Sequence, residues 1–152
     1  MEDKDVSYRM KIFDDLTPLE LYQILQLRSL VFVVEQNCVY LDADDKDQRS
    51  THLMISDQNG ILLAYARLLP EGLSYNGYAS IGRVVSHPEY RRFGWGRKIM
   101  EYALRECERL YPGIPIKISA QSYLLQFYQS MGFQPIGAEY LEDNIPHTAM
   151  IR

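Results

Sequence analysis

Near the middle of the chain, eight residues read Arg91-Arg92-Phe93-Gly94-Trp95-Gly96-Arg97-Lys98. A strand-like apolar run at residues 81–85 precedes them, and an amphipathic helical pattern at residues 99–111 follows them. The first turn of a helix presents unpaired backbone N–H groups and a partial positive charge. Glycines let a ligand approach that backbone, and the arginines add charge of the same sign. The stretch therefore predicts a phosphate-binding turn between a strand and a helix.

Length and composition predict a single domain over residues 1–152. The chain has 152 residues, 47% of them hydrophobic, which is enough for a sizeable core. Its net charge of -4 does not favour nucleic-acid binding. Cys38 and Cys107 are too few for a disulfide framework and lack zinc-ligand spacing, so we expect a reducing, cytoplasmic compartment and no metal.

Membrane association is not expected either. The first five residues lack the basic and apolar regions of a signal peptide. The longest apolar run, residues 61–66, is too short to span a bilayer.

The first third of the chain shows a strand followed by a helix. Residues 7–13 alternate polar and apolar side chains, as a half-buried strand does. Thr17 is expected to be the N-cap of the next helix, with Pro18 at its first position and Glu20 completing a capping box. The apolar residues 30–38 either continue this helix or form an irregular segment, and periodicity alone does not decide between the two.

The middle of the chain predicts three strands and a long helix. Residues 52–56 and 61–69 are strand-like, and Asp57-Gln58-Asn59-Gly60 between them indicates a hairpin. A third strand is expected at residues 78–86. The helix that follows the basic turn should run from about residue 96 to residue 111, where Pro112-Gly113 stops it.

The last third predicts a strand, a short helix and two closing strands. The first strand is expected at residues 114–120, and Ser122 is expected to cap a helix that ends at Met131. Residues 133–140 and 147–152 form the closing strands. The whole pattern predicts an α/β or α+β fold in which helices lie between strands of a mixed sheet.

Four aspartates gather between the first helix and the first hairpin, at Asp42, Asp44, Asp45 and Asp47. They do not form an EF-hand, because the sixth position is Asp47 rather than glycine and the twelfth is Leu53 rather than glutamate. A solvated acidic loop is the simpler interpretation.

The basic turn has the form Arg-x-x-Gly-x-Gly, which is moderately specific. The simpler alternative is a tight strand-to-helix turn with solvated arginines. Three features argue against it: a strand precedes the turn, an amphipathic helix follows it, and four of its eight residues are basic. The turn is neither a Walker A loop nor the three-glycine dinucleotide fingerprint, because the residues that define those motifs are missing.

Placed after Val84-Val85, this motif resembles the acyl-CoA signature of the GNAT superfamily of N-acetyltransferases. The segment Phe127-Tyr128-Gln129-Ser130-Met131-Gly132-Phe133 resembles the late helix-to-strand segment of that superfamily. Three further segments are similar to its ElaA-like branch: residues 32–38, Gln121 with Phe127-Tyr128, and residues 142–147. Together these matches cover most of the chain from about residue 27 to the end.

The resemblance implies a splayed, mixed but mostly antiparallel sheet with helices on both faces. It also implies that acetyl-CoA, as co-substrate, lies in the gap after the strand at residues 78–86. Backbone groups of Val84 and Val85 would pair with the pantetheine arm, and the turn's backbone amides would hold the pyrophosphate. The residues assigned to this donor site are Val84, Val85, Arg91, Arg92, Phe93, Gly94, Trp95, Gly96, Arg97 and Gln121.

The chemistry of acyl transfer needs an acid and a base. A phenol keeps its proton at neutral pH, so it can protonate a leaving thiolate, and Tyr128 occupies the family position for that acid. Simple core packing is the alternative for Tyr128. Glu35 and His147 are further catalytic candidates. The general base itself is left open among Glu35, Glu142, Asp143, His52 and His147, and for each histidine a structural role is the alternative.

We therefore expect a cytoplasmic N-acetyltransferase that transfers acetyl directly to a primary amine, with no acyl-enzyme. Cys38 is the one candidate nucleophile for a covalent route. The acceptor is expected to be a small-molecule or peptide amine, and the acidic loop with Glu35 and residues 142–143 favours a cationic one. The rival function is a non-catalytic acyl-CoA-binding or regulatory module, and transfer of a longer acyl group is a third option. Oligomeric state stays open, with a homodimer as one candidate.

Overall fold

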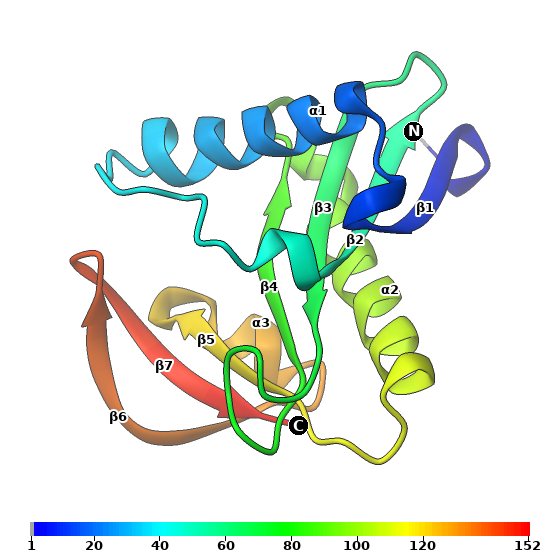
Figure 1. Ribbon diagram of the computed structural model, residues 1–152. Coiled ribbons are helices and arrows are strands. Elements are labelled where there is room, and N and C mark those ends of the chain that lie inside the picture. Colours follow the sequence, from blue (N-terminus) through cyan, green and yellow to red (C-terminus); the bar gives the residue numbers. More distant parts are fainter. Residues whose placement is uncertain (1) are drawn as a thin grey trace.

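The computed structural model describes residues 2–152, in which three main helices lie between groups of one to three strands (Figure 1). Their order is β1 Val6–Ile12, α1 Pro18–Arg28, β2 Thr51–Asp57, β3 Leu62–Leu69, β4 Ser80–Ser86, α2 Trp95–Leu110, β5 Lys117–Gln121, α3 Leu125–Gln129, β6 Gln134–Glu142 and β7 Ile145–Ile151. In this part of the chain, no helix has the length and apolar character needed to cross a membrane.

The strands form two antiparallel sheets that meet along one short contact. One sheet has the order β1-β2-β3-β4 and the other β5-β7-β6. A single parallel bridge, Ala79 to Ile116, joins them. There the Ala79 N–H donates to the Pro115 carbonyl (3.0 Å) and the Lys117 N–H donates to the Ala79 carbonyl (2.9 Å). Beyond this point β4 and β5 diverge (Figure 1), which confirms the expected splayed, mostly antiparallel sheet.

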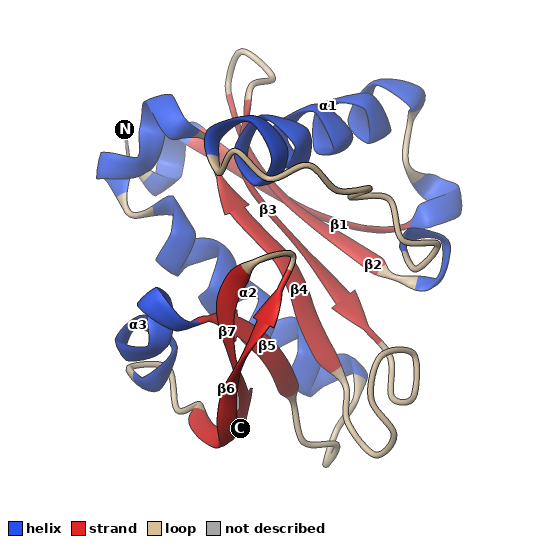
Figure 2. Cartoon of the chain, turned by 90° about the vertical axis from the view of Figure 1, so that its left-hand side faces the viewer, coloured by secondary structure: helices blue, strands red, loops and turns tan. Residues whose placement is uncertain are grey.

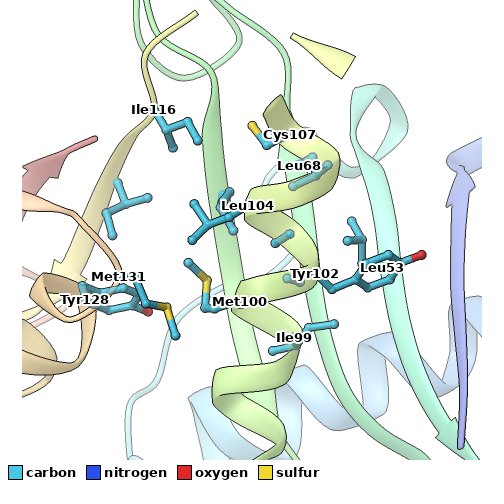
Figure 3. Packing of buried hydrophobic residues seen from close by; sticks show 14 of the residues in the cluster. Leu53, Leu68, Ile99, Met100, Tyr102, Leu104, Cys107, Ile116, Tyr128 and Met131 are labelled. Atoms are coloured by element: carbon cyan, nitrogen blue, oxygen red, sulfur yellow. The ribbon is translucent and has the colours of Figure 1, made fainter. Parts of the chain in front are cut away.

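Helices cover both faces of the four-stranded sheet because its inner strands are apolar on both sides. Leu53 and Ile55 of β2 belong to the core under α2, whereas Met54 between them packs with Ile24 and Leu27 of α1. Figure 2 shows α1 and α2 on opposite sides of the sheet. Figure 3 shows the α2 side, where apolar side chains of that helix lie against the strands.

Two local signals in the sequence, the capping box at Thr17 and the hairpin after Asp57, are confirmed. The Thr17 Oγ1 accepts the Glu20 N–H (3.1 Å), and the Glu20 carboxylate accepts the Thr17 N–H (2.9 Å), as expected for a capping box. The hairpin between β2 and β3 turns at Gly60, whose φ of 81° suits glycine.

The prediction that Ser122 caps a helix is wrong. Residues Ser122–Leu124 form a 3-10 turn, and the α-helix proper covers only Leu125–Gln129. The Ser122 hydroxyl lies 2.9 Å from the Thr148 hydroxyl on β7 instead, because β5 and β7 are adjacent strands.

The acidic loop is not the solvated loop that the sequence suggested, because arginines from the helix and the strands pair with three of its four aspartates, and only Asp45 is exposed. Asp42 and Asp47 are buried. The fully buried Arg28, at the end of α1, donates from Nε to Asp42 (2.7 Å) and from Nη1 to Asp47 (2.8 Å). Arg67 of β3 pairs with Asp44 and Asp47, and Arg83 of β4 pairs with Asp42 and Asp44. Three arginines thus meet three aspartates.

The ion pairs also lower the pKa values of Asp44 and Asp47. Burial alone would raise the pKa of Asp47, but the hydrogen bond and charge of Arg28 outweigh it, and the pKa falls below its ordinary value. The pKa of Asp44 is lowered in the same way by Arg67 against the effect of burial. The carboxylates of Asp44 and Asp47 therefore stay charged at neutral pH.

Replacing Arg28 with Met is expected to lower the free energy of unfolding by about 3–5 kcal/mol, because Asp42 and Asp47 lose a buried cation. Urea unfolding followed by circular dichroism measures the change. Arg109→Met is the matched control, since its pair with Glu106 is partly exposed and exposed pairs contribute about 0–1 kcal/mol. Equal losses in both variants would contradict a stabilising role for the buried pairs.

Candidate active site

A cavity of about 480 Å³ lies where β4 and β5 diverge. Segments far apart in the sequence form its wall: the residues after α1, the strand β4, the start of α2, the region from β5 to α3, and the hairpin of β6 and β7. The site residues predicted from the sequence that line this cavity are Glu35, Val84, Val85, Arg91, Gly96, Gln121, Tyr128 and His147.

The start of α2 forms one end of this cavity. Its N-cap is Gly94, whose φ is 76°, and no side chain caps the first turn. The N–H groups of this turn are therefore free of a side-chain acceptor, and the helix dipole adds partial positive charge. Arg91 and Gly96 both line the cavity here. This arrangement fits an anionic group such as a phosphate.

The other members of the basic turn do not line the cavity. Trp95 is completely buried in the core under α2, so only its backbone is left for a ligand. Arg92 lies over the Phe93 ring (5.1 Å to its centroid), and Arg97 donates to the Ser130 hydroxyl (2.7 Å). A role for their backbone amides stays a prediction.

The apolar segment left undecided by periodicity is a π-helix, Ser29–Glu35, that continues α1. Its wider turns appear as i to i+5 hydrogen bonds: the Gln36 N–H donates to the Val31 carbonyl and the Cys38 N–H to the Val33 carbonyl, both at 3.0 Å. Val31, Phe32, Glu35 and Gln36 line the cavity. Such helices are rare and often occur at functional sites.

Residues just after the π-helix cross to the other sheet. The side-chain amides of Gln36 and Gln121 bond to each other reciprocally (3.1 and 3.3 Å), and the Cys38 thiol donates to the Asp143 carbonyl (3.4 Å). These contacts tie the segment after α1 to β5 and to the β6–β7 turn, and all four residues line the cavity.

Tyr128 of α3 belongs both to the core and to the cavity wall. Its ring packs edge-on against Phe127 and Phe133, with ring centroids 5.1 and 6.0 Å away, and the residue is 8% exposed. Burial, with a smaller contribution from Tyr123, raises the pKa of Tyr128 to about 12. The two interpretations of this residue, packing and proton donation, are therefore compatible: the phenol keeps its proton beside the cavity.

A histidine–carboxylate pair lies on the opposite wall. His147 of β7 donates from Nδ1 to the Ile145 carbonyl (2.7 Å), and its Nε2 lies 3.2 Å from the Glu142 carboxylate. The ring stacks on Tyr140, with centroids 6.2 Å apart. Because Nδ1 is the donor to the carbonyl, Nε2 is the nitrogen through which this ring would exchange a proton, and the Glu142 carboxylate would stabilise the imidazolium.

The remaining candidate bases differ in their surroundings. Glu35 lines the cavity, but its carboxylate pairs with Arg91 at 2.5 Å. His52 is fully buried between the Tyr65 hydroxyl (2.7 Å) and the Asp47 carbonyl (2.8 Å), and burial lowers its pKa. It lies outside the cavity, so its candidacy as base is wrong.

Sequence reasoning missed several residues of the wall, including Tyr40, Ser119 and Tyr123. Tyr40 lies on a loop, Ser119 in the middle of β5 and Tyr123 in the 3-10 turn that follows, and no local motif marks any of them. The sequence does not decide whether Arg83 faces the cleft or pairs with an acidic residue. In the structure Arg83 does both, because it lines the cavity and pairs with Asp42.

Comparison with known proteins agrees with this geometry. The family profile described as Acetyltransferase (GNAT) domain matches residues 30–152. The crystal structure of an acyl-CoA N-acyltransferase from Pseudomonas aeruginosa superposes with a TM-score of 0.91 at 44% identity, over 97% of this chain and 99% of that one. The crystal structure of Escherichia coli ElaA gives a TM-score of 0.89 at 37% identity over the same shares.

Sequence relatives point to the same branch. ElaA of Escherichia coli is 40% identical over 140 residues, or 91% of this chain and 90% of ElaA. A UPF0039 protein of Schizosaccharomyces pombe is 42% identical over 147 residues, or 96% of each chain. The chain therefore belongs to the GNAT acetyltransferase family, and the expected similarity to ElaA is confirmed.

Gly94→Ala is expected to lower the free energy of unfolding by about 1–2 kcal/mol, because a side chain is strained in the left-handed conformation at φ 76°. Gly96→Ala is the matched control: its added methyl meets no atom within 4 Å and φ is not positive. In the helical first turn, that change should leave stability equal or raise it by up to about 1 kcal/mol. Urea titrations measure both, and similar losses at the two positions would contradict this account of the turn.

Proposed function

We propose that this protein is an acetyl-CoA-dependent N-acetyltransferase that passes the acetyl group directly to a primary amine in a ternary complex. The observation that carries the proposal is the position of Tyr128. This buried phenol, with a pKa raised to about 12, lines the same cavity as the uncapped start of α2. A binding module without turnover has no need for a proton donor at that point.

The donor is proposed to lie along β4. Its pyrophosphate fits the free N–H groups at the start of α2 beside Arg91. The outer edge of β4 has only one bridge to β5, so backbone groups near Val84 and Val85 are available to pair with an extended pantetheine arm. Gly96 keeps the first helical turn open, since nothing lies within 4 Å of its missing side chain.

The proposed reaction begins with a neutral amine. Its nitrogen attacks the thioester carbonyl carbon, a backbone N–H of β4 donates to the developing oxyanion, and the C–S bond breaks with its electron pair on sulfur. Tyr128 then gives its proton to the thiolate. The proton lost by the amine goes to a base, for which His147 Nε2 beside Glu142 is better placed than the arginine-paired Glu35.

Direct transfer is favoured over a covalent route through Cys38. The Cys38 thiol donates to the Asp143 carbonyl and contacts no histidine in residues 2–152 that would activate it. Trapping of acetyl-Cys38 after mixing with acetyl-CoA alone would overturn direct transfer.

The acceptor is proposed to be a cationic small-molecule or peptide amine. The Asp42–Asp47 loop does not favour such an acceptor, because arginines pair with Asp42, Asp44 and Asp47. Glu142 and Asp143 remain, since both line the cavity at the β6–β7 turn and neither pairs with an arginine there. They can attract a second positive charge on the acceptor.

Tyr128→Phe is expected to reduce kcat about 10²-fold, because the thiolate loses its proton donor. The affinity for CoA, measured by calorimetry, should not change. Tyr123→Phe is the matched control: this tyrosine also lines the cavity but is 75% exposed, and its loss should leave kcat within about twofold. Because the pKa of Tyr128 is about 12, wild-type kcat should show no alkaline decline below pH 10. A fully active Tyr128→Phe enzyme would rule out this acid.

A thiol-release assay with acetyl-CoA against polyamines, amino sugars, amino acids and peptides tests the acceptor. Acceptors with a second positive charge should have the lowest KM, and Glu142→Gln with Asp143→Asn should raise that KM about tenfold while leaving CoA affinity unchanged. A preference for anionic amines would contradict the proposal. CoA binding without thiol release from any amine would favour the non-catalytic module.

A further inference from the structure

Strand β4 contains a bulge at the point where it faces the cavity. Tyr65 of β3 is opposite Val85 and Arg67 is opposite Gly82, so two residues, Arg83 and Val84, stand against the single residue between them. Arg83 has a φ of 50°, in the left-handed region. A side chain is disfavoured there, so contacts outside β4 must hold this conformation.

Those contacts come from the acidic loop. The Arg83 guanidinium lies 2.8 Å from the Asp42 carboxylate through Nε and donates through Nη2 to the Asp42 carbonyl (2.9 Å). Its Nη2 is also 3.5 Å from the Asp44 carboxylate, and the Tyr40 ring lies 5.9 Å away. One side chain thus connects the bulge to four groups of the loop.

The loop is a firm anchor because it is held from two other elements. Arg28 of α1 fixes Asp42 and Asp47, and Arg67 of β3 fixes Asp44 and Asp47. Both arginines are buried, so water competes little for these bonds. The position of Arg83 is therefore set by the same groups that hold α1 on the sheet.

The bulge decides which backbone groups of β4 face the cavity. After the bridge at Ala79, the outer edge of β4 has no partner strand, and each residue from 81 to 86 lines the cavity. One extra residue in a strand shifts the alternation of N–H and C=O groups along its edge. Losing the fixed conformation at Arg83 would move the groups at Val84 and Val85.

We propose that Arg83 is a positioning residue: its pairs with Asp42 and Asp44 hold the β4 bulge, and thereby aim the edge of β4 at the pantetheine arm of the donor. The inference rests on the proposed function. It makes the acidic loop a part of the donor site, although the loop's carboxylates do not themselves contact the donor.

Two substitutions of Arg83 separate its charge from its backbone conformation. Arg83→Ala removes the ion pairs and keeps the strain of φ 50°, so CoA affinity should fall about tenfold, with kcat falling alongside and acceptor KM little changed. Arg83→Gly also removes the ion pairs but adopts positive φ freely. It should recover a clear part of the lost affinity. Arg83→Lys should lie between Arg83→Ala and wild type. Calorimetry with CoA gives the affinities.

Arg152→Ala is the matched control for stability. This arginine pairs with Glu108 and donates to the Met131 carbonyl (2.7 Å), away from the cavity. Its loss should lower Tm without changing CoA affinity. Affinities of Arg83→Ala equal to wild type, or equal in Arg83→Ala and Arg83→Gly, would overturn the inference. If wild type itself fails to bind CoA, the proposed function fails instead. Should Arg83→Ala not fold, Asp44→Asn must show the same selective loss of CoA affinity, to a smaller extent.

Discussion

The structure depends on the fact that β4 and β5 share one bridge and no more. Had the two strands paired along their length, the sheet would be continuous and the cavity would not exist. The bridge between Ala79 and Ile116 instead holds the two sheets together at one end, and the strands separate toward the other end. The same separation leaves the outer edge of β4 without a partner and brings the start of α2 and Tyr128 to a common space. The placement proposed for the donor therefore rests on the topology first and on individual side chains second.

Features that depend on neighbouring residues could be predicted from the sequence. The capping box at Thr17, the hairpin after Asp57 and the glycine turn at Gly94 each use hydrogen bonds or φ angles within a few residues. The motif around Arg91 indicated the family for the same reason, since a phosphate turn is a local structure. Its side chains were less predictable: Trp95 lies in the core, because the first turn of α2 also packs on the sheet.

Features that depend on distant partners could not be predicted. The acidic loop looked solvated because its arginine partners come from α1, β3 and β4, up to 41 positions away along the chain. The π-helix has no periodicity signal distinct from an α-helix over seven residues. The contact between Gln36 and Gln121 at the cavity wall joins positions 85 residues apart. For the acidic loop and for this contact the deciding interaction is tertiary, and composition and spacing do not contain it.

The burial of Trp95 has a practical consequence for spectroscopy. The chain contains one tryptophan, so all of its indole fluorescence arises from the first residue of α2. That indole is shielded from water, and the Lys98 ammonium lies 4.5 Å from its ring centroid. A cation at this distance acts electrostatically on the ring, so emission responds to any change in that charge or its position. The protein thus contains an intrinsic optical reporter at the end of the cavity where the helix begins.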